Sequence, residues 1–271
     1  MIEMEVSRRN FARGIAGAAA LGLAAGGANQ ALADSLSQLE GQKPRKIAIL
    51  IGSGQDVDLG NTAKLAAEFA RGATEMGHEV TSYLIGQMDI KPCLGCGHCR
   101  QSEERTCVWD DDMAKIYDAY WESDMLVFAT PMRYWMISGM LKNVIERFYR
   151  VPDGGDFLDL PHDRHETYRP IDVALLVSSA DTGWYTYNWL REWYHTCLCN
   201  FMGWNGRGHL FVGGSGEYSW GSNDEMHRQG STKHVEDTGG LEAAYEFGRS
   251  VYAEEPLDQQ LVEASEWSML K

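Results

Sequence analysis

The residues best suited to chemistry are four of the six cysteines, which lie within one short stretch, residues 93–107. Cys93, Cys96 and Cys99 fall at every third position, and Cys107 follows later in the same stretch. Thiolates at this density suit a polynuclear iron–sulfur cluster, because its iron atoms take cysteine ligands from a short, folded-back loop. The spacing therefore predicts that these four thiols bind a [4Fe–4S] cluster.

Two other uses of the cysteines stay open at this point. Zinc sites usually draw on two cysteine pairs separated by a longer segment, which this stretch lacks. Disulfides are the second alternative, although three thiols in a C-x-x-C-x-x-C run are poorly placed for two separate bridges. His98, inside the stretch, is interpreted as a solvated loop residue, and Cys197 and Cys199 as buried free thiols.

The first 33 residues have the pattern of an export signal. Arg8 and Arg9 precede Phe11, and an uncharged run rich in Ala, Gly and Leu covers residues 14–27. Ala31 and Ala33 then provide a small-residue cleavage site. The arginine pair resembles a twin-arginine signal, and the apolar run is short for a membrane span. An uncleaved amphipathic anchor is the alternative.

This signal predicts a protein exported through the twin-arginine pathway to the periplasm or another extracytoplasmic space. That pathway moves folded proteins, and its passengers often carry a cofactor inserted in the cytoplasm, such as a flavin or an Fe–S cluster. Residues 34–44 are interpreted as a leader, residues 45–253 as one folded domain and residues 254–271 as a peripheral tail. The export context also favours the disulfide alternative.

The 271-residue chain has a formal net charge of -15, which narrows the choice of partners. Nucleic acid is not expected, because phosphate binding needs basic patches. Adsorption to anionic membrane surfaces is not expected either. We interpret the acidity as a contribution to solubility.

Apolar runs alternate with amphipathic segments along the domain. Predicted strands cover residues 46–52, 79–85, 124–130, 171–178 and 209–212; predicted helices cover residues 60–76, 111–121, 138–150, 184–202 and 241–252. This alternation predicts a parallel sheet with right-handed crossovers. Five strands fit an α/β, flavodoxin-like, doubly wound sheet with strand order 2-1-3-4-5. The second strand has a mixed pattern that suits a sheet edge, and Asp110 is a candidate cap for the second helix.

In such sheets ligands bind beyond the carboxyl ends of the strands, and three loops lie there. The first combines hydroxyls with a helix start and predicts a monophosphate site, because the P-loop and G-x-G-x-x-G patterns are absent; its residues are Ser53, Gln55, Gly60, Asn61 and Thr62. The second, suited to gripping a planar ring, contains Pro131, Met132, Arg133, Tyr134 and Trp135. The third offers Asp181 and Gly183 to a ring edge.

Three segments resemble the NADPH-dependent FMN reductase family: G-S followed by G-N-T, the segment from Ile90 to Met113 with its cysteines and D-D-M, and T-P-M-R-Y-W followed by S-G-M-L-K-N-V-I-E-R. The similarity covers about residues 46–150. It implies FMN as cofactor, with Ser53, Asn61 and Thr62 on the phosphate and the second loop along the isoalloxazine. The cysteines resemble the motif of the iron–sulfur flavoproteins of this family.

The resemblance implies an FMN-dependent oxidoreductase with NAD(P)H as donor, and homo-oligomers are expected. Because nicotinamide is scarce outside the cytoplasm, the alternative is an electron carrier that exchanges electrons with a redox protein. Less favoured alternatives are a non-redox binding protein without flavin, and zinc in the cysteine stretch. Since that stretch follows the second strand, it is expected to approach the flavin edge.

Overall fold

The computed structural model describes residues 43–58, 60–102, 105–151, 169–180, 187–214, 235–236 and 238–252. The predicted signal, the tail from residue 254, and the candidate site residues Asp181 and Gly183 lie outside these described residues.

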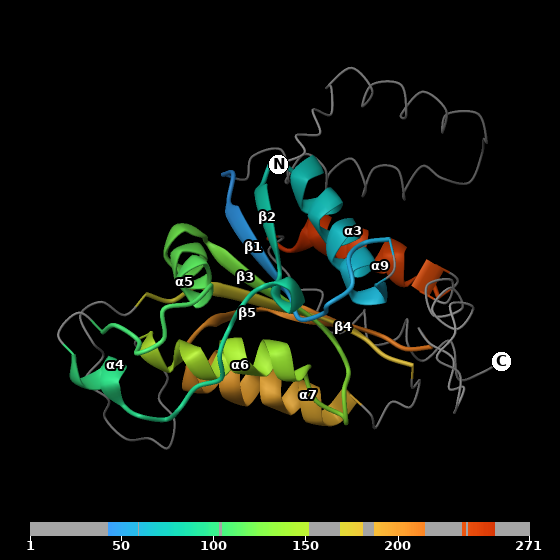
Figure 1. Cartoon of the computed structure of the whole chain (residues 1–271). Coiled ribbons are helices and arrows are strands. Elements are labelled where there is room, and N and C mark those ends of the chain that lie inside the picture. Colours follow the sequence, from blue (N-terminus) through green and yellow to red (C-terminus); the bar gives the residue numbers. More distant parts are fainter. Residues whose placement is uncertain are drawn as a thin grey trace, which may run out of the picture. The chain divides into compact units, whose positions relative to one another are not determined.

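Five parallel strands form one sheet in the order β2-β1-β3-β4-β5 (Figure 1). Their bounds are β1 (Lys46–Ile51), β2 (Glu79–Leu84), β3 (Met125–Pro131), β4 (Asp172–Ser178) and β5 (Asn205–Val212). The predicted flavodoxin-like order is confirmed. The second strand lies at an edge of the sheet, as its mixed pattern predicted, and all of its residues are exposed or half-buried.

Helices cover both faces of the sheet (Figure 1). One face carries α3 (Asn61–Glu75) and α9 (Gly240–Ser250); the other carries α5 (Met113–Glu122), α6 (Gly139–Arg147), and α7 (Asn188–Trp193) continued by the π-helix η6 (Tyr194–Phe201). Short helical turns are η2 (Ile85–Gln87), α4 (His98–Gln101) and η3 (Phe148–Arg150). Each face has its own hydrophobic core.

Strand β1 shows why the central strands are mostly apolar. Ile47 and Ile49 pack into the core under α3 and α9, whereas Ala48 and Leu50 pack into the core on the other face. Successive side chains of a strand point to opposite faces, so a strand covered on both faces is apolar over most of its length, with buried polar residues such as Thr130 and Asp172 near strand ends.

Two glycines allow α3 and α9 to pack closely. A Cβ built at Gly248 would lie 2.1 Å from the carbonyl oxygen of Phe69, and one at Gly72 would lie 2.1 Å from that of Tyr245. Because both obstacles are backbone atoms, a larger residue would push the helices apart. The two glycines therefore fix how α3 sits on the sheet. This matters for the site because α3 follows the first candidate site loop.

Some element boundaries differ from the sequence-based predictions. The helix expected from residue 111 begins at Met113, and Asp110 does not cap it. The helix expected over residues 138–150 ends at Arg147 and tightens into η3. The last strand begins earlier than predicted, at Asn205. At the start of the first of these helices, the Asp111 carboxylate accepts a hydrogen bond from the N–H of Met113 at 3.2 Å.

Candidate functional site

The loops after β1, β3 and β4 begin at adjoining points on the carboxyl edge of the sheet. The N–H of Gly52 donates to the carbonyl of Ala129 at 2.7 Å, and the N–H of Met132 donates to that of Ser178 at 2.8 Å. The hydroxyl of Ser179 also lies 3.8 Å from the sulfur of Met132. Backbone hydrogen bonds therefore extend the sheet into the region where the predicted ring-binding residues lie.

The loop after β1 is a tight turn that leads into α3. The Ser53 hydroxyl is buried and accepts a hydrogen bond from the N–H of Gln55 at 3.1 Å, and the N–H of Gly60 donates to Asp56 O at 2.8 Å. Gly60 is the N-cap residue of α3 and has no side chain, so it provides no side-chain oxygen to cap the first turn of this helix. Uncapped N–H groups at a helix start can bind a phosphate.

The residues predicted to bind the phosphate differ in their exposure to solvent. Gln55 is exposed and Asn61 is half-buried. Thr62 is only 3% exposed, and its hydroxyl lies 2.6 Å from that of Ser178. The Thr62 hydroxyl therefore links α3 to the end of β4. Because a hydroxyl can accept one hydrogen bond and donate another, Thr62 could still donate to a phosphate if Ser178 is the donor of this pair, and that role stays a prediction.

The short helical turn η2 packs against this loop through its central residue, Gly86. The N–H of Gly86 donates to Ser53 O at 3.1 Å, and a Cβ at Gly86 would lie 2.4 Å from the Cα of Gly54. Only glycine fits at this close approach. The contact holds the phosphate loop from the side of the edge strand.

The loop after β3 is a two-residue turn with aromatic residues at its tip. Arg133 and Met136 exchange two backbone hydrogen bonds, of 2.8 and 3.0 Å. Tyr134 and Trp135 between them have φ of 50° and 61°, and a positive φ at both central residues is what a type I′ turn requires. Such turns normally carry Asn-Gly, because residues with a Cβ are strained there.

This strained turn presents its aromatic side chains to solvent. Tyr134 is 93% exposed and Trp135 is 53% exposed. Its far end is anchored, because the N–H of Ser138 donates to the Thr130 hydroxyl at 2.9 Å and the Ser138 hydroxyl caps α6. Backbone strain at an anchored turn with exposed aromatic rings is typical of a functional site.

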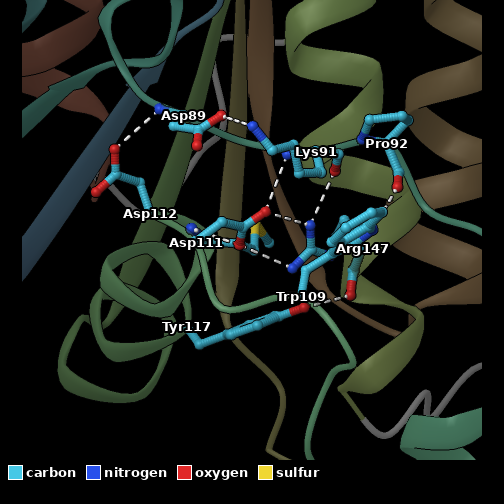
Figure 2. Close-up of polar contacts among 9 residues, drawn as sticks. Asp89, Lys91, Pro92, Trp109, Asp111, Asp112, Tyr117 and Arg147 are labelled. Carbon is cyan, nitrogen blue, oxygen red and sulfur yellow. Dashed lines mark hydrogen bonds and ion pairs between the residues drawn. The ribbon is translucent and has the colours of Figure 1, made fainter.

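The two ends of the cysteine loop, residues 93–107, are joined at their base (Figure 2). The N–H of Asp112 donates to Asp89 O at 3.1 Å, and the N–H of Asp89 donates to the Asp112 carboxylate at 2.9 Å. The indole N–H of Trp109 donates to Pro92 O at 3.1 Å. We call this base, residues 89–92 with residues 109–112, the neck of the loop.

A buried ion pair lies inside the neck (Figure 2). The Arg147 guanidinium donates to both carboxylate oxygens of Asp111, at 2.8 and 3.0 Å, and both side chains are 2% exposed. The guanidinium also donates to Lys91 O at 2.8 Å, and the N–H of Lys91 donates to the Asp111 carboxylate at 2.9 Å. One guanidinium thus connects α6 with both sides of the neck.

The surroundings of this pair shift three pKa values. Burial raises the pKa of the Asp111 carboxyl, but the hydrogen bonds from Arg147 and from the Lys91 N–H outweigh it and bring this pKa below its ordinary value. Burial acts to lower the pKa of Arg147, and the Asp111 carboxylate more than offsets it. Burial raises the pKa of Tyr117 to about 12, and its hydroxyl donates to Arg147 O at 2.9 Å. All three groups keep their ordinary charge at neutral pH.

The four predicted cluster ligands line one hollow. Cys93, Cys96, Cys99 and Cys107 share its walls with the end of α6 and with η3, and its volume is about 30 Å³. All six cysteines lie in the described part of the chain, and each is a free thiol. Burial, and then the charge of Cys107, raises the pKa of the Cys99 thiol.

The donor set fits an iron–sulfur cluster, but the thiols are not yet gathered around one point. Among the described residues, no three His, Cys, Asp or Glu side chains stand close enough to hold a metal ion. A hollow of 30 Å³ has room for about one water molecule. None of the four residues of α4, which carries Cys99, is buried, and the segment is held by exposed or half-buried contacts such as that of Arg100 with the Tyr149 ring, 4.4 Å from its centre.

The cysteine loop and the aromatic turn lie at opposite ends of α6 (Figure 1). The turn directly precedes the Ser138 cap, whereas Arg147, Tyr149 and Arg150 line the cysteine hollow. The nine residues of α6 span about 13 Å at 1.5 Å per residue. The two features therefore lie apart along α6, and the approach of the cysteine loop to the flavin edge stays a prediction.

A second hollow adjoins Cys107 on the side of α5. Its volume is about 180 Å³, and it shares Cys107, Tyr117 and Arg147 with the first hollow. The Arg150 guanidinium lies 4.4 Å from the centre of the Tyr117 ring, as a cation–π contact. Two guanidinium groups therefore lie close to the last cysteine of the loop.

Comparison with known proteins identifies the family. The model of the family described as NADPH-dependent FMN reductase matches residues 45–184. The chain belongs to this family. The matched segment contains the loop after β1, the aromatic turn and the cysteine loop, so all three resemblances noted in the sequence lie inside it.

Curated relatives are similar over the same part of the chain. An iron-sulfur flavoprotein from Archaeoglobus fulgidus is 31% identical over 87 residues, which are 32% of this chain and 42% of the relative. One from Methanosarcina thermophila is 31% identical over 87 residues, 32% of this chain and 44% of the relative. The chain thus spans less than half of the length of these relatives.

Solved structures share the fold at low sequence identity. An NAD(P)H:quinone oxidoreductase from Methanothermobacter marburgensis has a TM-score of 0.51 and 14% identity, covering 79% of this chain and 98% of that protein. An azoreductase from Bacillus anthracis has a TM-score of 0.51 and 13% identity, covering 76% and 99%. These similarities support the flavodoxin-like fold. Within the described residues, no helix has the length and apolar character to span a membrane.

Proposed function

We propose that the protein is an FMN-dependent oxidoreductase. The observation that carries the proposal is the strained turn of Tyr134 and Trp135 beside the carboxyl edge of the sheet, in a chain of the FMN reductase family. Bound FMN would supply hydride and single-electron transfer, which is the chemistry of the flavin itself.

The residues of this edge divide into two groups in the proposal. Ser53, Gln55, Gly60, Asn61 and Thr62 hold the FMN phosphate, chiefly through the N–H groups at the start of α3. Pro131 and Met132 with the aromatic turn hold the isoalloxazine, and Asp181 and Gly183 contact its edge. Arg133, exposed in the turn, supplies positive charge near the ring. No side chain here is assigned an essential acid–base role.

We also propose that the cysteine loop holds a [4Fe–4S] cluster. Support comes from four free thiols on one hollow and from relatives that are named iron-sulfur flavoproteins. Cys93, Cys96, Cys99 and Cys107 are the proposed ligands, and the cluster would supply one-electron capacity. Zinc and disulfides are the competing uses, and metal analysis with thiol counting separates all three.

The family suggests NAD(P)H as the electron donor, with a small molecule or a protein as acceptor. The second candidate function is an electron carrier that a redox protein reduces, which the predicted export favours. A steady-state assay of the holoprotein with NADH and NADPH separates the two. Turnover supports the reductase, whereas reduction by a redox protein alone supports the carrier.

Export through the twin-arginine pathway is a separate proposal, supported by Arg8 and Arg9 ahead of an uncharged run. Replacing both by Lys (R8K/R9K) should keep the protein in the cytoplasm, as measured by cell fractionation. Equal export of the variant would contradict the proposal. We propose homo-oligomers as well, and sedimentation of the holoprotein tests that assembly.

A further inference from the structure

The neck of the cysteine loop is built from contacts in which no cysteine takes part. Asp89 pairs with Asp112 through two hydrogen bonds, and Trp109 donates to Pro92 O. The inner contacts join Lys91, Asp111 and Arg147. None of these bonds involves a proposed cluster ligand, so the neck is built independently of the four thiols.

The Arg147 guanidinium is the central group of this neck. It binds Asp111 through two parallel hydrogen bonds and at the same time reaches Lys91 O, so it fixes the segments before and after the loop to one point on α6. A lysine cannot reproduce this arrangement, because its ammonium group lacks the planar fork of an arginine. Burial makes the pair sensitive, since losing one partner leaves the other charge unpaired and out of water.

The neck restrains the positions of two of the four thiols more than those of the other two. Cys93 follows Lys91 by two residues, and Cys107 precedes Asp111 by four. Their backbone positions are therefore set by the neck. Cys96 and Cys99 lie farther along the loop, at or beside α4, where no residue of the helix is buried. The loop thus has two thiols near a fixed base and two on a segment without core packing.

We propose that Arg147 is a positioning residue that presets the outer thiols, Cys93 and Cys107, and that Cys96 and Cys99 move toward them when a cluster binds. The movement of Cys96 and Cys99 rests on the cluster proposal, which it deepens. The presetting of Cys93 and Cys107 concerns the cluster-free chain alone, so it is tested separately.

The first experiment measures the alkylation rate of each cysteine in the cluster-free, FMN-loaded protein by mass spectrometry. Replacing Arg147 by Met should raise the rates at Cys93 and Cys107 several-fold and leave Cys96, which is already exposed, unchanged. Equal acceleration at all four thiols, or none, would overturn the positioning role. The R147K variant keeps the positive charge but lacks the planar fork of the guanidinium. It should therefore still show the faster alkylation rates at Cys93 and Cys107.

The second experiment measures iron and FMN per chain after anaerobic reconstitution. R147M should lose most of the iron bound by the wild type and keep its FMN; loss of both in proportion would indicate a general folding role and overturn the proposal. The control is R207M, which removes the partly buried Arg207–Asp172 pair (3.1 Å) in the β4–β5 region. If R147M does not fold, D111L/R147M removes both charges together.

The two proposals fail in different ways. If the wild type binds no iron, the cluster proposal fails, while the alkylation pattern still reports whether the neck presets the outer thiols. If the wild type binds iron and R147M binds it equally well, the positioning role fails and the cluster proposal stands.

Discussion

The two ends of α6 carry two sites that are held in different ways. At its amino end, the aromatic turn and the phosphate loop continue from strand ends and are fixed by backbone hydrogen bonds such as Met132 to Ser178. At its carboxyl end, the cysteine loop depends on side chains, above all Asp111 and Arg147. Backbone hydrogen bonds tolerate most substitutions, so the first site should resist single mutations that disable the second.

The largest expected effect comes from breaking the buried pair. Asp111→Ala leaves the Arg147 guanidinium without its carboxylate in a site where both side chains are 2% exposed. We expect a loss of about 3–5 kcal/mol in the free energy of unfolding. Urea denaturation measures it. Glu146→Ala, which removes the exposed pair with Lys142, should cost no more than about 0.5 kcal/mol.

A backbone clash at the first site should have the next largest effect. Gly86→Ala places a Cβ 2.4 Å from the Cα of Gly54, and neither backbone can yield easily. We expect a cost of about 1–3 kcal/mol together with weaker FMN binding, measured by fluorescence titration. Gly139→Ala is the control, because nothing lies within 4 Å of its Cβ. Equal FMN affinity in both variants would show that this contact does not shape the phosphate loop.

Relieving the strain in the turn of Tyr134 and Trp135 should raise the stability of the protein, whereas the two changes above should lower it. Tyr134→Asn with Trp135→Gly supplies the residues that a type I′ turn prefers, so the protein should gain stability, by about 1–2 kcal/mol for the relief at Trp135. The same variant should bind FMN more weakly, since both aromatic rings are gone. Thermal unfolding of the apoprotein and FMN titration measure the two effects. If the variant were neither more stable nor weaker in FMN binding, the strained turn would not be part of the FMN site.

Acid unfolding should report on the second site. Because the pKa of Asp111 is lowered in the folded state, its contribution to stability is complete above the unfolded pKa of about 3.9 and is lost as pH falls through the lower folded value. The difference in unfolding free energy between wild type and Asp111→Asn should therefore shrink below about pH 4. A difference that stays constant down to acid-induced unfolding would contradict this assignment.

The smallest expected effect concerns Arg133. Its exposed guanidinium should stabilise negative charge on the reduced flavin, so Arg133→Ala should lower the flavin reduction potential slightly, because solvent screens the charge. Spectroelectrochemistry of the FMN-loaded protein measures this shift. An unchanged potential would remove Arg133 from the ring-side group. Lys142→Ala, on the exposed side of α6, serves as the charge-matched control.

The first site could be predicted from sequence because it follows from the sheet. Continuous apolar runs such as residues 46–52 indicate buried parallel strands, and parallel strands place their following loops at one edge. The angles of Tyr134 and Trp135 could not be predicted, since the local sequence does not favour a type I′ turn. Strain of this kind persists only because the surrounding fold imposes it.

The neck of the second site was not predicted. The D-D-M and E-R segments appeared in the resemblance, but nothing local pairs Asp111 with Arg147, which lie 36 positions apart. The Asp111 carboxylate also accepts a hydrogen bond from the N–H of Met113 at 3.2 Å, where the helix starts. The contact with Arg147 places the cysteine loop at the carboxyl end of α6, and the approach of this loop to the flavin edge stays a prediction.

The most direct test of the account is a cofactor analysis of the full chain purified without oxygen. FMN, iron and acid-labile sulfide are quantified on one sample, and its visible spectrum is recorded. We expect flavin bands, about one FMN per chain, and about four iron and four sulfide per chain. A colourless protein, or flavin accompanied by zinc or by disulfide-linked cysteines instead of iron, would contradict it.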